Sequence, residues 1–144
     1  MGKKKVIQKS GDGNVEEKAK VAGAGGSSKK IENGNVYVNA SYNNTVITVT
    51  DSNGNVVAWS SAGTLGFSGP KKATPFASSK VVAALAEKMK KTGPFSLNII
   101  VKGVGSGRDS AIRTFAAQGF NILSVKDATP IPHNGPRPPK VRRV

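Results

Sequence analysis

Six consecutive residues, from Gly103 to Arg108, combine the features of an anion-binding loop. The segment reads GVGSGR and lies between an apolar run and an amphipathic segment. Glycines let backbone amides approach an anion closely, and the start of a helix adds partial positive charge, so Gly103, Gly105, Gly107 and Arg108 are candidate phosphate ligands. The spacing matches neither a Walker A loop nor the dinucleotide motif G-x-G-x-x-G. A simple strand-to-helix turn is an equally good interpretation.

A pair of lysines forms a second candidate site. Lys71 and Lys72 end a glycine-rich loop directly before Thr74-Pro75, a dipeptide typical of a helix start. Main-chain and ammonium groups at such a place can bind a phosphate together, although a solvated pair explains the sequence as well. We add Arg113, in the second predicted helix, to the candidate phosphate ligands.

The segment from Asp127 to Val144 is a basic tail that cannot fold alone. It holds five of the eight prolines and no acidic residue after Asp127. Proline lacks a backbone donor, and like charges repel, so an external anionic surface must order the segment. We assign His133 and Asn134 of this tail to nucleic-acid binding together with its four cations: Arg137, Lys140, Arg142 and Arg143.

Composition points to a polyanionic partner and leaves little room for catalysis. The formal net charge is +14, which favours nucleic acid; a membrane is the weaker candidate because no run of about 18 apolar residues occurs. The absence of cysteine and the single histidine exclude thiol chemistry, a histidine triad and a multi-histidine metal site, and we expect no cofactor. Two-metal chemistry would require that Asp51, Asp109 and Asp127 converge.

Three zones follow from the composition. Residues 1–30 are rich in Lys, Gly and Ser, which predicts a mobile basic arm. Residues 31–127 form the compact domain, and residues 128–144 form the extended tail. No apolar stretch suited to a secretory signal occurs at the amino end, so we expect a cytoplasmic protein, with an organellar presequence left open.

The domain is predicted to be α/β. Alternating and β-branched residues predict strands at 35–40, 45–50 and 56–61, with Asn53-Gly54 turning the second hairpin. A helix is expected from Pro75 to near Thr92, a strand buried on both faces at 97–101, a helix at about 109–118 and a strand at 122–125. Within this order we interpret Trp59 as a partly buried sheet residue rather than a base-stacking one. Recognition of a nucleic acid should therefore rest on its backbone and its shape rather than on its individual bases.

The dipeptide Asn134-Gly135 is a candidate modification site. Glycine does not hinder attack of its amide on the preceding side chain, which leads to isoaspartate. Of the three Asn-Gly dipeptides, Asn134 is expected to react first because its tail is free until bound, whereas Asn53 lies in a hairpin. A simple turn is the alternative interpretation.

Several longer segments resemble the bacterial-type family of small-subunit ribosomal protein number eleven. They read NNTVITVTDSNGNVVAWSSAGTLGF, KKATPFAS, KGVGSGRDSAIR and KDATPIPHNGPRPPK, with VRRV at the end. The resemblance implies a three-layer α/β/α fold of the ribonuclease-H-like type with a mixed sheet and without nuclease activity. It also implies that the protein bridges rRNA helices on the platform of the small subunit and contacts proteins seven and eighteen. Its tail would lie near the mRNA exit and the Shine-Dalgarno region.

The sequence thus predicts a non-enzymatic, rRNA-binding ribosomal protein that supports translation, with no homo-oligomer expected. Two alternatives stay open. A general RNA- or DNA-coating protein would have the same charge, and a ribonuclease-H-like nuclease would need the converging carboxylates.

Overall fold

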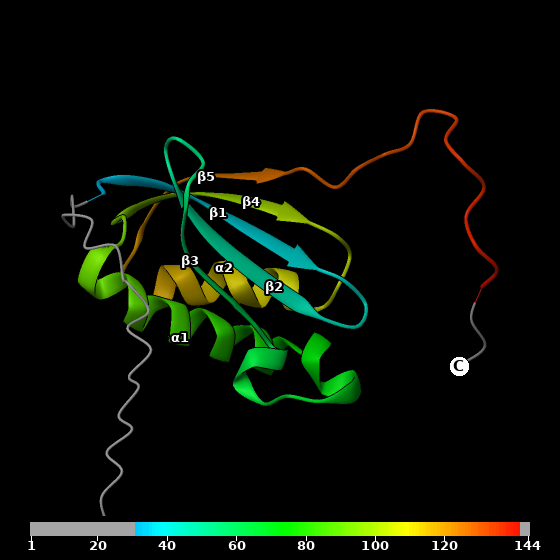
Figure 1. The fold of residues 1–144 in the computed structure, drawn as a ribbon, viewed down its shortest axis with the longest axis horizontal. Coiled ribbons are helices and arrows are strands. Elements are labelled where there is room, and N and C mark those ends of the chain that lie inside the picture. Colours follow the sequence, from blue (N-terminus) through cyan, green and yellow to red (C-terminus); the bar gives the residue numbers. More distant parts are fainter. Residues whose placement is uncertain (1–30, 142–144) are drawn as a thin grey trace, which may run out of the picture.

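Five strands form one mixed sheet in the described part of the chain, residues 31–141 of a computed structural model (Figure 1). The strand order is β3-β2-β1-β4-β5. β1 is antiparallel to β2 and β2 to β3, while β4 runs parallel to β1 and to β5. The strands are β1 (Asn33–Ala40), β2 (Thr45–Asp51), β3 (Val56–Ser61), β4 (Ser96–Lys102) and β5 (Asn121–Asp127).

The predicted order of strands and helices is confirmed. The turn between β2 and β3 forms where Asn53-Gly54 predicted it, because the Asp51 carboxylate accepts hydrogen bonds from the backbone amides of Asn53 and Asn55, at 2.9 and 2.8 Å. Gly54 has φ +92°, a conformation that glycine adopts without steric cost. Two short 3-10 helices, η1 (Gly63–Leu65) and η2 (Gly69–Ala73), were not predicted.

Helix α1 (Pro75–Thr92) has the predicted ends. Thr74 caps its start, where the hydroxyl accepts a hydrogen bond from the Ala77 amide at 3.3 Å, and Pro75 occupies the first turn. Gly93 and Pro94 end it as expected. Helix α2 (Gly107–Ala117) begins two residues earlier than the expected Asp109, so Gly107 belongs to its first turn.

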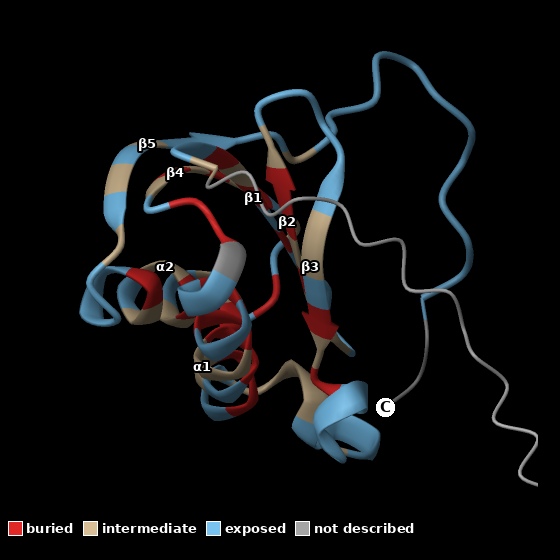
Figure 2. Ribbon diagram, turned by 60° about the vertical axis from the view of Figure 1, so that its left-hand side comes forward, coloured by how far each residue is buried: buried red, intermediate tan, exposed pale blue. Residues whose placement is uncertain are grey.

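Both helices pack on the same face of the sheet, so the prediction of three layers is wrong for the described chain (Figure 2). One core joins Val81 and Leu85 of α1 and Phe115 of α2 to the same side of β1, β2 and β4. The expectation that β4 is buried on both faces fails for the same reason. Leu97, Ile99 and Val101 are buried, whereas the alternate residues of this strand are partly exposed. The likeness to ribonuclease-H-like folds stays a prediction.

The opposite side of the sheet carries no helix in residues 31–141, and we call it the open face. Trp59 lies on this face and is 56% exposed, which corrects its interpretation as a partly buried residue. Strand β3 is an edge strand, so the indole has neighbours on one side only. The paired registers place on the open face, among others, Asn35, Tyr37, Asn39, Thr48, Trp59, Asn98, Ile100, Lys102, Ser124 and Lys126.

Candidate nucleic-acid interface

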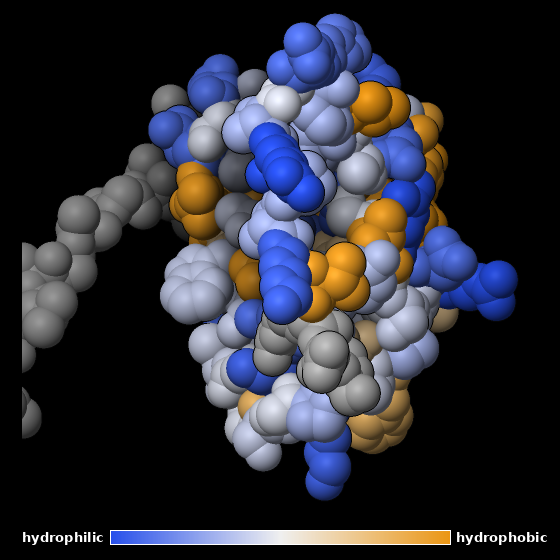
Figure 3. All heavy atoms as spheres, turned by 90° about the vertical axis from the view of Figure 1, so that its right-hand side faces the viewer, coloured by the Kyte–Doolittle hydropathy of each residue, from blue (hydrophilic) through white to orange (hydrophobic). Residues whose placement is uncertain are grey.

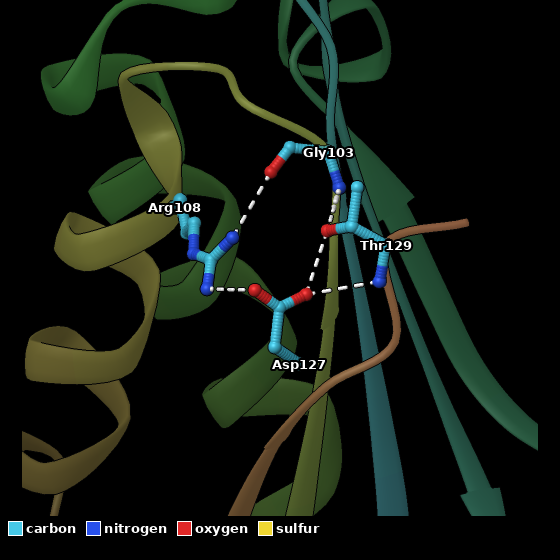
Figure 4. Close-up of polar contacts among 4 residues, drawn as sticks. All are labelled: Gly103, Arg108, Asp127 and Thr129. Atoms are coloured by element: carbon cyan, nitrogen blue, oxygen red, sulfur yellow. Dashed lines mark hydrogen bonds and ion pairs between the residues drawn. The ribbon is translucent and has the colours of Figure 1, made fainter. Parts of the chain in front are cut away.

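A closed ring of hydrogen bonds fixes the root of the tail, and we call its four residues the tail anchor: Gly103, Arg108, Asp127 and Thr129 (Figure 4). The Arg108 guanidinium donates to Asp127 Oδ2 at 2.7 Å and to the Gly103 carbonyl at 3.2 Å. The Thr129 hydroxyl donates to Asp127 Oδ1 at 2.6 Å and accepts from the Gly103 amide at 3.2 Å. The ring therefore joins the end of β4, the start of α2 and the end of β5.

The charge state of Asp127 depends on this ring. The hydroxyl and the amide of Thr129, followed by the Arg108 guanidinium, lower the pKa of Asp127 to about 2. Each of these groups stabilises the carboxylate relative to the carboxylic acid. The Ala128 amide also donates to the Val101 carbonyl at 2.8 Å, so the backbone continues the sheet pairing where the tail begins.

The glycines of the predicted anion-binding loop are required by packing against the turn between β1 and β2. A Cβ atom on Gly103 would lie 2.2 Å from the Ala40 carbonyl oxygen, and one on Gly105 would lie 2.4 Å from the Ser41 carbonyl oxygen. The Gly105 amide donates to the Ala40 carbonyl at 2.9 Å. The amides of Gly103 and Gly105 thus already have hydrogen-bond partners inside the protein. This favours the interpretation of the loop as a tight strand-to-helix turn.

The starts of α1 and α2 meet through serine side chains. The buried Ser78 hydroxyl donates to the Gly107 carbonyl at 2.8 Å, and the Ser106 hydroxyl donates to the Ala73 carbonyl at 2.7 Å. Ser110 donates to the Pro75 carbonyl at 2.8 Å. Both positive helix ends are therefore held on the same side of the molecule.

A groove of about 570 Å³ lies along this junction and presents the Arg113 side chain. Its wall also includes Asp109, four residues earlier in α2, so the groove carries charges of both signs. The other lining residues are small or hydroxylated: Pro75, Ser79, Ser106, Ser110, Thr114 and Ala117.

Lys71 and Lys72 lie in η2, directly before the start of α1, as the sequence predicted. The Lys71 side chain is exposed and that of Lys72 is partly exposed. The Ser106 hydroxyl bond to Ala73 brings η2 next to the loop after β4. The structure therefore groups the lysine pair with the start of α2, although the two segments are more than thirty residues apart in the sequence.

The tail runs away from the domain after Thr129 (Figure 1). Four predicted ligands in it, His133, Asn134, Arg137 and Lys140, are exposed. Asn134 has φ +57°, the left-handed conformation that asparagine adopts more readily than other residues with side chains. Figure 3 looks at the end of the molecule from which the tail leaves, where hydrophilic and hydrophobic residues alternate on the surface. Arg142 and Arg143, like the predicted arm at residues 1–30, lie outside the described residues.

Comparison with known families decides the identity of the chain. The family model for ribosomal protein S11 matches residues 34–143, which include the sheet, both helices and nearly all of the tail. The chain belongs to the ribosomal protein S11 family. Membership gives it a structural role in the small ribosomal subunit, with RNA binding and translation as its context. The resemblance seen in the sequence is thereby confirmed at the level of the family.

Two of the carboxylates named for the nuclease alternative lie far apart in this S11 family member. Asp51 pairs with Gly34, whereas Asp127 pairs with Val101, which in turn pairs with Val38. Val38 lies four positions after Gly34 in β1, which is about 13 Å along the strand. Two-metal sites place their ions about 4 Å apart, so Asp51 and Asp127 cannot share one. No cluster of three or more His, Cys, Asp or Glu side chains suited to a metal occurs within residues 31–141.

Sequence reasoning missed the pairing of Arg108 with Asp127. It treated Arg108 as a free cation and Asp127 as the last acidic residue before the tail. Both residues follow or end neighbouring parallel strands, and the carboxyl ends of such strands lie at the same edge of a sheet. This signal can be used only once β4 and β5 are known to be parallel neighbours, and the structure shows that pairing.

A search for long membrane-spanning helices among the described residues finds none.

Proposed function

We propose that this chain binds and bridges rRNA helices on the platform of the small ribosomal subunit, with its tail near the mRNA exit region. The match to the S11 family over residues 34–143 carries the proposal. The net charge of +14 supports it, since cations that neutralise phosphates release counterions and so gain affinity. The role is architectural, and the protein performs it on the cytoplasmic ribosome.

The folded domain contributes phosphate contacts near the two helix starts. Lys71 and Lys72 lie together in η2 before the start of α1, and Arg113 lines the groove between α1 and α2. Serine hydrogen bonds hold these elements together. The backbone that carries these cations is already ordered, so a contact made by them costs less backbone conformational entropy than one made by a free chain. Contacts to phosphate fix the position of the protein on the RNA.

Arg108 takes a different role from the one expected. Its guanidinium holds Asp127 and the Gly103 carbonyl, so we assign it first to the tail anchor, and a direct phosphate contact by Arg108 or by the glycine amides remains a prediction. The anchor gives the tail a fixed starting direction. Beyond it, Arg137 and Lys140, followed by Arg142 and Arg143, reach RNA that the domain itself does not touch.

Neighbouring proteins seven and eighteen of the small subunit are the protein partners that we propose. The family match supports them as partners. The prolines keep the tail extended and semi-rigid without a core of its own, so the tail can reach beyond the domain. His133 and Asn134 mark a bend in the tail and are proposed to lie against rRNA there.

Competition binding separates this proposal from a general nucleic-acid coat. The full chain is titrated with small-subunit rRNA at physiological salt, in the presence of duplex DNA or of an unrelated RNA of the same length. We expect the rRNA to bind on the order of 10³-fold more tightly, the lower end of specific recognition. Equal affinities for all three nucleic acids would refute the proposal and favour the coating protein.

A further inference from the structure

A row of side chains crosses the open face from one edge strand to the other. Trp59 on β3 pairs with Thr48 on β2, which pairs with Tyr37 on β1, and Tyr37 pairs with Ile100 on β4. Lys126 on β5 completes the row beside Ile100. Trp59 and Tyr37 are 56% and 36% exposed. Two aromatic rings and a lysine therefore lie in line on a face that no helix covers within residues 31–141.

We propose that the open face binds unpaired RNA nucleotides, with bases stacked on Trp59 and Tyr37. This inference rests on the proposed rRNA-binding function and assigns to it a second surface, separate from the helix starts and the tail. Base stacking on exposed aromatic side chains is a general means of holding single strands, because every base has a π-face.

The spacing of the two rings selects an extended strand. Tyr37 and Trp59 are two strands apart in the sheet, which corresponds to about 10 Å. Stacked neighbouring nucleotides in a helix are only about 3.4 Å apart, so bases in a duplex cannot cover both rings. Splayed bases of a loop or bulge can, and such bases are the usual targets of RNA recognition by stacking.

A row of amides lies next to the aromatic row. The Asn98 side chain donates to Asn35 Oδ1 at 3.3 Å, and the Ser124 hydroxyl donates to Asn98 Oδ1 at 2.9 Å. These bonds hold the amides in place, and they leave the Asn35 NH₂ group without a bonded partner among the described residues. An amide with free donors can bind the edge of a base that stacks on the adjacent ring.

The charges on this face favour an anionic partner such as RNA over a basic or neutral protein surface. In strands β1 to β5, the charged side chains on the open face are Lys102 and Lys126. The two acidic residues at strand ends, Asp51 and Asp127, pair with Gly34 and Val101, whose buried positions belong to the helix-covered side. Two cations on β4 and β5, on the same face as the two aromatic rings and with no carboxylate in these strands on that face, complement a phosphate backbone.

Trp59 is the only tryptophan of the chain, so its fluorescence reports directly on this face. The full chain is titrated with an unstructured oligouridylate of about 10 nucleotides, within the site sizes of single-strand binders. We expect saturable quenching, and we expect an RNA duplex of the same length to leave the emission unchanged. The variant Tyr37→Thr should bind the oligouridylate about 5- to 150-fold more weakly, the fold-change that the loss of one stacked base produces.

Matched variants keep the outcome interpretable. Threonine preserves β-propensity at position 37, and circular dichroism verifies the fold of each variant. Tyr42→Thr removes an aromatic that is 80% exposed in the turn after β1, away from the row, and should leave the affinity unchanged. Unquenched Trp59 fluorescence, or equal affinities of the wild type and Tyr37→Thr, in a chain that still binds small-subunit rRNA would overturn the inference and indicate a protein partner for this face. If the wild type does not bind small-subunit rRNA at all, the proposed function itself is refuted.

Discussion

Replacement of Gly103 by alanine tests whether the loop after β4 is defined by packing. Gly103 has φ +97°, and an added Cβ would meet the Ala40 carbonyl oxygen at 2.2 Å. A left-handed conformation costs a residue with a side chain about 1–2 kcal/mol, and overpacking adds about 1–3 kcal/mol. The free energy of unfolding should therefore fall by about 2–5 kcal/mol, a large share of the usual 5–15 kcal/mol.

Two other glycines separate these contributions. Gly54 has φ +92° with no atom within 4 Å of an added Cβ, so Gly54→Ala should cost only the conformational part, about 1–2 kcal/mol. A Cβ on Gly105 would meet the Ser41 carbonyl oxygen at 2.4 Å, and no positive φ accompanies this contact, so Gly105→Ala should cost only the overpacking part, about 1–3 kcal/mol. Urea denaturation with linear extrapolation measures the free energy of unfolding of all three variants. If Gly103→Ala costs no more than Gly54→Ala, the close approach to Ala40 is not a determinant of the fold.

Three further predictions concern the tail. The folded pKa of Asp127 is about 2, below the ordinary 3.8, so the stabilising effect of its carboxylate is complete above pH 4 and is lost as the pH falls toward 2. Asp127→Asn should remove this part of the pH dependence of the free energy of unfolding, and an unchanged pH profile would count against the anchor. Ending the chain after Pro130 removes the four tail cations but keeps Thr129, so the slope of log affinity for rRNA against log salt concentration should become shallower by up to about 3–4. An unchanged slope would mean that the tail does not contact phosphate. Peptide mapping of aged free protein should find isoaspartate at Asn134 before Asn53, since the Gly54 amide donates to the Asp51 carbonyl at 3.3 Å; conversion of Asn53 first would contradict this order.

Local signals in the sequence predicted most of the elements correctly. The hairpin at Asn53-Gly54, the cap at Thr74 and the stop at Gly93-Pro94 each depend on a few adjacent residues, so their physics is contained in a short segment. The buried stripe of α1, with Leu85 among its members, followed from helical periodicity for the same reason.

Long-range arrangements were the part that the sequence did not predict. Ile99, Ile100 and Val101 form a continuous apolar run that is equally compatible with one covered face or two, and only the packing of both helices on one side decides between them. Trp59 was misjudged because its exposure depends on the edge position of β3. The tail anchor joins Arg108 to a residue nineteen positions away, beyond any local pattern.

Sedimentation with small ribosomal subunits tests the central proposal most directly. The full chain carrying a tag is expressed in cells, and ribosomes are separated into subunits and washed at high salt. We predict that the chain remains with the small subunit after the wash, whereas a chain ending after Pro130 is released at lower salt. Release of the full chain together with general nucleic-acid-coating proteins, or its equal distribution over both subunits, would contradict the assignment.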